Sequence, residues 1–139
     1  MTSQPVSNLK DMLASLSPQL NEKRVAYIAS KDVQTVIARL PADAIIGTFR
    51  EDEATTFIVE LTAAENSGFE VLFRGAWITL TVRSALTGVG LTAAFATALG
   101  NEGISANVFA AYYHDHIFVS VDDADRAMAA LRRLQQDNL

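Results

Sequence analysis

The sequence predicts an α+β protein of two ferredoxin-like modules in tandem, each an antiparallel sheet with helices on one face. Three observations predict this fold: alternating apolar patterns typical of strands, apolar residues at helical spacing, and a strand–helix–strand–turn–strand–helix order that occurs twice. One copy runs from Arg24 to Gly68 and the other from Ala76 to Gln135. We therefore expect an N-terminal module with an extra N-terminal helix at residues 1–73, and a C-terminal module at residues 74–139.

The second copy carries the clearest patterns. Residues 76–82 alternate apolar side chains with threonines, as in a strand with one buried face. Apolar residues at helical spacing predict a helix over residues 91–99, which we expect to end at Gly100 and Gly103. Two apolar runs follow. Their short connector, His114-Asp115-His116, allows only an antiparallel hairpin.

The remaining elements follow from similar patterns. We expect a first helix capped by Ser7 and ended by Pro18, strands over residues 24–30, 44–49, 56–61 and 69–73, short helices over 33–40 and 62–67, and a final helix over 124–134 capped by Asp122.

The second copy lacks a final strand in this pattern, because the chain ends soon after its last helix. An unpaired sheet edge exposes backbone groups that another chain can cover. We therefore expect a homodimer or a larger homo-oligomer.

Composition excludes several classes of function. Half of the residues are hydrophobic, 19% are charged and the net charge is -5, which fits a protein with a packed core. The eleven Lys and Arg are scattered, which argues against a nucleic-acid surface. There is no cysteine and no pattern of a secretory signal. The uncharged stretch 84–101 is interrupted by glycines and polar residues, so we expect a cytoplasmic protein without a membrane span.

One loop distinguishes the two copies. Between first strand and first helix, the first copy has only Ser30-Lys31-Asp32, whereas the second has Arg83–Gly90. Gly88–Ala93 matches G-x-G-x-x-A, but a dinucleotide fold requires parallel strands where this chain predicts a hairpin. Glycines still allow a close backbone approach, and a helix N-terminus favours an anion. A site for a carboxylate or small phosphate and a plain tight turn both remain open.

Three other groups of residues suggest chemistry, and we favour a structural role for each. His114 and His116 lie two apart in extended backbone, where both rings can meet one metal ion. The acidic run Glu51-Asp52-Glu53 is typical of a solvated turn. Ser84 with His116 and Asp115 has the composition of a catalytic triad, but nothing indicates a strained turn around the serine. We therefore expect no catalytic residue, no metal and no cofactor.

The run SALTGVGLTAAFATALGNEGISANVFAAYYHDHIFVSVDDADRAMAAL resembles the C-terminal half of a family of small stand-alone bacterial ACT-domain proteins. The specific parts are Val89–Ala93, Ile104–Val108 and Tyr112–Val119, and the N-terminal half resembles the family through Thr48–Glu53. That family is similar to the regulatory domains of aspartokinases and to the eukaryotic cytosolic arginine sensor. The resemblance covers nearly the whole chain and implies tandem ACT modules.

In such proteins, ACT modules pair side by side and hold an amino acid in the seam between them. The resemblance thus implies a regulatory or sensor protein that is not an enzyme, with a small amino acid or similar carboxylate as ligand. Two alternatives are a ligand-free dimerisation module and a metal-dependent enzyme using His114 and His116. The implied ligand-binding residues are Ser84, Leu86, Thr87, Gly88, Val89, Gly90 and Leu91, with Asn107 and Val108 from a neighbouring module. Ala85 and Thr87 stand where many members have a second serine or an acidic residue.

Overall fold

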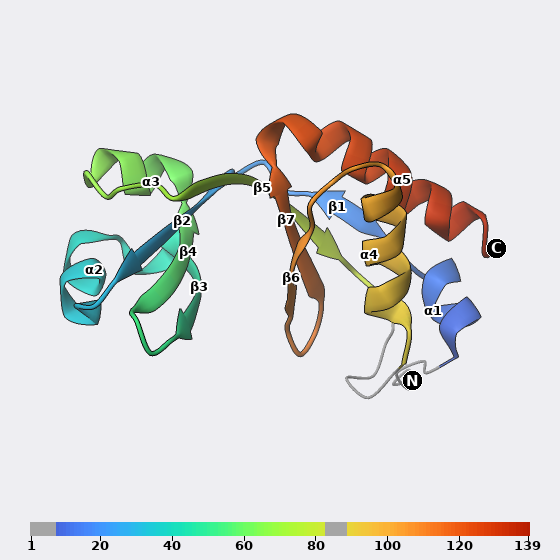
Figure 1. The fold of residues 1–139 in the computed structure, drawn as a ribbon, viewed down its shortest axis with the longest axis horizontal. Helices are drawn as coiled ribbons and strands as arrows, with labels where there is room; N and C mark the ends of the chain where they lie inside the picture. Colours follow the sequence, from blue (N-terminus) through green and yellow to red (C-terminus); the bar gives the residue numbers. More distant parts are fainter. Residues whose placement is uncertain (1–7, 83–88) are drawn as a thin grey trace. The chain divides into compact units, whose positions relative to one another are not determined.

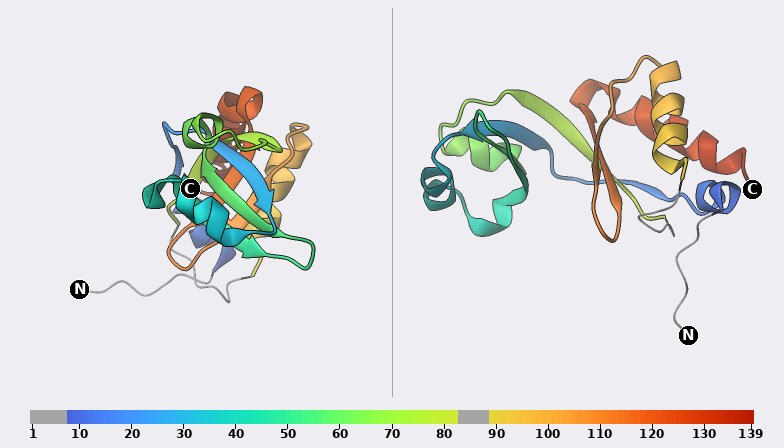
Figure 2. Two further views of the ribbon diagram at one scale, coloured as in Figure 1. Left: turned by 90° about the vertical axis from the view of Figure 1, so that its left-hand side faces the viewer. Right: turned by 60° about the horizontal axis from the view of Figure 1, so that its bottom comes forward.

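The computed structural model describes residues 8–82 and 89–139. The chain forms two compact units (Figures 1 and 2). We call residues Glu22–Ala76 the N-unit. The C-unit consists of Trp77–Leu139 together with the N-terminal segment up to Asn21. The chain thus begins in the C-unit, enters the N-unit after Asn21 and returns at Trp77.

The N-unit has the strand and helix order of one ferredoxin-like module. Its elements are β2 (Val25–Ser30), α2 (Val33–Arg39), the 3-10 turn η1 (Ala42–Ala44), β3 (Ile45–Arg50), β4 (Thr55–Glu60), α3 (Leu61–Asn66) and the beginning of β5 (Phe73–Leu80). The strands are antiparallel in the order β3-β4-β2-β5. Val36 of α2 and Ala64 of α3 share one core with Ile28 and Phe57 of the sheet, so both helices cover the same face.

The C-unit repeats this architecture with one permuted strand. Its elements are α1 (Leu9–Ala14), β1 (Pro18–Leu20), the later part of β5, α4 (Leu91–Asn101), β6 (Asn107–Ala110), β7 (Asp115–Ser120), η2 (Val121–Asp123) and α5 (Ala124–Gln136). The sheet order is β1-β5-β7-β6. Helix α5 packs on β1 and β7 and contacts both α4 and α1. The two units confirm the predicted tandem of ferredoxin-like modules.

The fourth strand of the C-unit sheet comes from the N-terminal segment. β1 pairs antiparallel with β5, and Gln19 lies opposite Thr79. Beyond the ends of β1, the Thr81 amide donates to the Ser17 carbonyl at 3.1 Å and the Asn21 amide donates to the Trp77 carbonyl at 2.8 Å. The expectation of an unfinished sheet edge is therefore wrong, because the chain fills that edge itself. The compact units also differ from the expected division at residues 1–73 and 74–139, since the first 21 residues join the C-unit.

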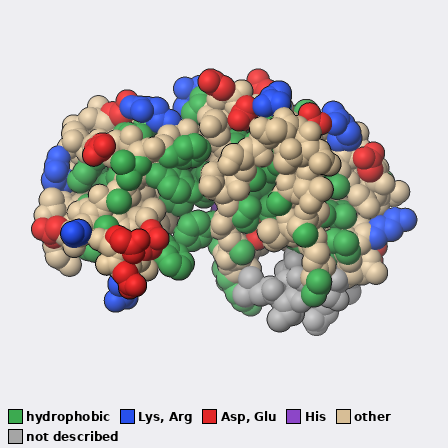
Figure 3. Space-filling view, viewed as in Figure 1, with side chains coloured by type: hydrophobic (Ala, Val, Ile, Leu, Met, Phe, Trp, Pro, Cys, Tyr) green, Lys and Arg blue, Asp and Glu red, His purple; other side chains and the backbone are tan. Residues whose placement is uncertain are grey.

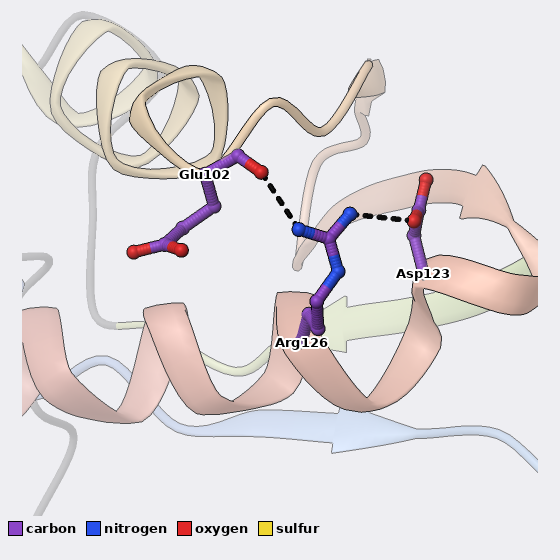
Figure 4. Close-up of polar contacts among 3 residues, drawn as sticks. All are labelled: Glu102, Asp123 and Arg126. Carbon is purple, nitrogen blue, oxygen red and sulfur yellow. Dashed lines mark hydrogen bonds and ion pairs between the residues drawn. The ribbon is translucent and has the colours of Figure 1, made fainter.

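An arginine ties α4 to the start of α5. Arg126 donates from Nη1 to the Glu102 carbonyl and from Nη2 to Asp123 Oδ1, both at 2.8 Å (Figure 4). Asp123, rather than the expected Asp122, is the N-cap residue of α5. One guanidinium therefore connects the C-cap residue of α4 to the residue where α5 begins.

Several element boundaries differ from the sequence-based expectation. Helix α1 ends at Ala14, not at Pro18, which instead opens β1, a position in an edge strand where the missing N–H is tolerated. Asn8 caps α1, accepting from the Asp11 amide at 3.2 Å, whereas the expected cap Ser7 lies outside the described residues. Of the predicted strand 69–73, only Phe73 belongs to a strand.

The β6–β7 turn also lies earlier than expected. The Ala111 amide donates to the His114 carbonyl, as the Glu51 amide donates to the Ala54 carbonyl in the β3–β4 turn. Asp115 and His116 consequently belong to β7 and do not form the turn.

Two further observations concern nucleic-acid binding and membrane insertion. On the face shown in Figure 3, Lys and Arg side chains are dispersed and are not gathered into one basic patch. Within residues 8–82 and 89–139, no helix has the length and apolar character needed to cross a membrane.

Helix α4 begins at a glycine with left-handed backbone. Gly90, its N-cap, has φ +98° and ψ -14°. A Cβ atom at Gly90 would lie 3.2 Å from Leu9 Cδ2, so α1 covers this glycine. Gly100, by contrast, lies inside α4 with open space around it, and the helix continues to Asn101. Gly103, with φ +72°, follows the C-cap residue Glu102.

We expect alanine at Gly90 and alanine at Gly100 to have opposite effects on the free energy of unfolding. Gly90→Ala should lower the free energy of unfolding by about 1–2 kcal/mol, because a side chain is strained at this φ. Gly100→Ala should raise it by about 0.5–1 kcal/mol, because alanine favours a helix interior. Urea denaturation of both variants measures the two effects. Equal changes in the two variants would show that Gly90 is not required by its backbone conformation.

Candidate ligand site at the start of α4

The structure describes part of the predicted site. Ser84, Leu86, Thr87 and Gly88 lie outside the described residues. Val89, Gly90 and Leu91 form the entrance to α4, and Asn107 and Val108 open β6. The described residues of the site therefore fall into two groups, one at a helix start and one in a strand.

The start of α4 is exposed, and no side chain of the described residues caps it. Val89 is 82% exposed, and Thr92 and Ala93 in the first turn are also exposed. Leu91 is buried and fixes the helix to the core. The first N–H groups of a helix have no partner within the helix, and Gly90 has no side chain that can accept from them. This end of α4 is therefore suited to an external acceptor that carries negative charge.

The equivalent helix of the N-unit begins differently. Only Lys31 and Asp32 separate β2 from α2, and Asp32 is the N-cap. Its Oδ1 accepts from the Thr35 amide at 3.2 Å, and its Oδ2 accepts from the Thr35 hydroxyl at 2.7 Å. The hydrogen bonds from the Thr35 hydroxyl and amide lower the pKa of Asp32. A carboxylate of the chain itself thus occupies the start of α2.

Helix α1 adds to the site a residue that lies far from it in the sequence. Leu9 packs on Gly90, as described above, and Met12 and Leu13 of the same helix are buried. Gln135 of α5 donates from Nε2 to the Ala14 carbonyl at 3.1 Å, which holds the other end of α1. The helical pattern around Leu9 predicted a buried stripe, but no local signal indicates a contact with a residue 81 positions later.

The second group lies at the outer strand of the C-unit sheet. Val108 is opposite Ile117 in the β6–β7 pairing. Asn107 donates from Nδ2 to the Phe118 carbonyl at 3.2 Å, so its amide nitrogen is used within the sheet. This bond turns the Asn107 side chain toward β7 and leaves its Oδ1 as the atom suited to accept a hydrogen bond from a ligand.

The two histidines do not form a metal centre with the described residues. Their ring centroids are 6.4 Å apart. His116 Nδ1 accepts from the Trp77 indole at 3.0 Å, which occupies one of its two nitrogens. Among the residues that the structure describes, no cluster of three or more His, Cys, Asp or Glu could hold a metal ion. Ser84 of the hypothetical triad lies outside the described part of the chain.

The acidic turn of the N-unit has a structural contact. Glu51 Oε1 accepts from the Thr56 hydroxyl at 2.6 Å across the β3–β4 hairpin. This bond supports the interpretation of Glu51-Asp52-Glu53 as a turn.

Both halves of the chain match models of the ACT domain, over residues 4–75 and residues 73–133. No curated protein matches the sequence. Among solved structures, a Vibrio cholerae protein described as of unknown function and possibly a transport protein is 41% identical. The match covers 91% of this chain and 95% of that chain, with a TM-score of 0.81.

Aspartate kinases share the fold at lower identity. The ligand-free regulatory subunit of aspartate kinase from Thermus thermophilus is 12% identical over 86% of this chain and 99% of that chain, with a TM-score of 0.65. E. coli aspartokinase III, in complex with aspartate and ADP, is 13% identical over 86% of this chain and 32% of that chain, with a TM-score of 0.56. The two family matches confirm the resemblance, and the chain belongs to the ACT-domain family as a tandem of two ACT domains.

Proposed function

We propose that this chain is a cytoplasmic regulatory protein that binds a small amino acid at the start of α4 and catalyses no reaction. The contrast between its two modules is the observation that carries this proposal. Asp32 places a carboxylate on the first turn of α2, whereas α4 begins at Gly90 after a connection of ten residues, Thr81–Gly90. The α-carboxylate of a ligand would take the place at α4 that Asp32 takes at α2.

Backbone N–H groups would hold that carboxylate. The N–H groups of Val89, Gly90 and Leu91 precede or open α4. Ala93 is the third residue after the N-cap Gly90, as Thr35 is the third residue after the N-cap Asp32, and the Thr35 amide donates to Asp32. A hydrogen bond to a charged group contributes about 1.5–3 kcal/mol. The positive end of the helix dipole adds a smaller attraction of the same sign. In this proposal Ser84, Leu86, Thr87 and Gly88 complete the loop around the ligand.

The α-ammonium group needs acceptors, and we place them on β6 of a facing module. Asn107 Oδ1 and the outward-facing backbone carbonyl of Val108 are suited to this role, because the Asn107 amide nitrogen already donates to Phe118 and neighbouring carbonyls of a strand point to opposite sides. Their position in the outer strand of the C-unit sheet leaves them accessible to a second copy. The proposed site therefore requires a homodimer or larger assembly.

The ligand prediction is tested by a thermal-shift screen of the proteinogenic amino acids followed by calorimetry. Binding should raise the melting temperature, because a ligand at 100 times its Kd stabilises the native state by about 2.7 kcal/mol. Val89→Asp should lower the affinity by about fivefold or more, because it places a second negative charge beside the ligand carboxylate. Val89→Asn, which has nearly the same shape without the charge, should bind like the wild type.

Three results distinguish the alternatives. Unchanged affinity in Val89→Asp would place the ligand elsewhere. Equal losses in both variants would indicate a steric effect on the loop instead of repulsion of a carboxylate. If no amino acid changes the melting temperature or gives a calorimetric signal, the ligand-free dimerisation module becomes the better account.

The proposed site also predicts that the chain forms a homodimer or a larger assembly in solution. Sedimentation velocity at micromolar concentration should give at least twice the mass of one chain, because a facing β6 completes the proposed site. A single species with the mass of one chain, with and without the amino acid identified in the screen, would contradict this part of the proposal.

A further inference from the structure

A chain of hydrogen bonds crosses the C-unit sheet from Asn21 to His116. Asn21 donates from Nδ2 to Thr79 Oγ1 at 3.1 Å, and Thr79 Oγ1 lies 3.2 Å from His116 Nδ1. The Trp77 indole donates from Nε1 to the same His116 nitrogen at 3.0 Å. These residues come from three segments: Asn21 directly follows β1, Trp77 and Thr79 lie in β5, and His116 lies in β7. One imidazole nitrogen is therefore the meeting point of side chains from two neighbouring strands.

The direction of these bonds fixes the protonation of His116. An indole N–H can only donate, so His116 Nδ1 must present a lone pair. The Thr79 hydroxyl accepts from Asn21 and has its own proton to donate to His116. All of these bonds are satisfied together by a neutral imidazole with its proton on Nε2. A proton on Nδ1 would face the indole N–H, donor against donor.

The surroundings of His116 also favour its neutral form. Its neighbours Trp77, Thr79 and Phe109, from β5 and β6, carry no charge, nor does Asn21. The titratable groups of the same strand region are His114, with its ring centroid 6.4 Å away, and the adjacent Asp115. Burial, and secondarily the positive charge of His114, lower the pKa of His116. Burial raises the pKa of Asp115, although His114 opposes this.

We propose that His116 is a pH-dependent hydrogen-bond switch within the C-unit: it accepts from the Trp77 indole when neutral and loses this hydrogen bond when protonated. The switch acts on Asn21 and Trp77, which are linked to each other by further hydrogen bonds. Asn21, in addition to its bond to Thr79, donates to the Trp77 carbonyl from its backbone amide at 2.8 Å and from Nδ2 at 3.0 Å. Asn21 and Trp77 are the residues at which the chain leaves the C-unit and re-enters it. Protonation of His116 therefore weakens a network attached to both crossings.

The expected pH dependence has a definite sign. In the unfolded chain a histidine takes up a proton near its ordinary pKa of about 6.5. Because the folded state lowers the pKa of His116, the unfolded state binds more protons between that lowered pKa and about 6.5. Stability is therefore lost as pH falls through this window, by up to tenfold in the unfolding equilibrium constant per pH unit. Asp115 acts with the opposite sign, since its raised pKa favours the folded state as pH falls.

The test uses the full chain and the indole N–H signal of Trp77, which is its only tryptophan. In proton–nitrogen correlation spectra of the wild type, this signal should move between pH 8 and pH 4.5 with a midpoint below 6.5. His116→Gln should abolish the transition, because the Gln oxygen accepts from the indole without titrating. His114→Gln should retain it. Urea denaturation should show a shallower loss of stability below pH 6.5 in His116→Gln than in the wild type. Asp115 is present in both proteins, so its opposite effect does not account for the difference.

The proposal fails if the indole signal of the folded wild type is independent of pH over this range. It also fails if His116→Gln shows the same transition as the wild type, since another group would then be responsible. Nitrogen spectra of the imidazole in wild-type protein at pH 7.5 provide a measurement without any substitution. They should show Nδ1 unprotonated and Nε2 protonated, and the opposite tautomer would overturn the proposal.

Discussion

The antiparallel pairing of β1 with β5 is the interaction on which the rest of the C-unit depends. A ferredoxin-like module needs four strands, and the described residues of 77–139 supply three of them. Pro18–Leu20 provides the fourth by pairing with Ile78–Leu80. This pairing places Met12 and Leu16 in the core, each with no exposed surface, and gives α5 a strand to pack on. The N-terminal segment is therefore an integral part of the second ACT module, although the first module separates it from the rest in sequence.

The same segment explains why α1 reaches the start of α4. Once β1 is paired, the preceding helix is held against α4 and α5, and Leu9 packs on Gly90. The loop that we propose as the ligand site thus ends against a helix from the beginning of the chain. The two modules differ at this helix start, where α2 has the carboxylate of Asp32 and α4 has a glycine. Copies of one fold often keep their cores and diverge in the loops that bind ligands.

Sequence reasoning predicted the features that depend on local pattern. The alternation around Ile78 and Leu80 and the helical spacing of Phe95 and Leu99 are signals of burial, and all four side chains are buried. The pairing of Pro18–Leu20 left no such signal. A three-residue strand has too short a pattern, and its partner is about sixty residues away. The sequence pattern predicts the β6–β7 turn too late in the chain, because Asp115 and His116 are residue types common in turns. Asp115 instead pairs with Ala110, in a register that depends on all residues of the two strands. Likewise, the link between His116 and Trp77 depends on strand order and is not visible in either segment alone.

The register of β1 against β5 determines how the second module is completed, and a cross-link measures that register directly. The chain contains no cysteine, so an introduced pair has no competitor. Gln19 and Thr79 lie directly opposite each other, at a spacing within the range that a disulfide spans. Gln19→Cys with Thr79→Cys should form an intramolecular disulfide under mild oxidation. Gln19→Cys with Thr81→Cys, displaced by two residues along the same strand, should not. Equal cross-linking of both pairs, or cross-links formed only between chains, would contradict the completion of the second module by its own N-terminal strand.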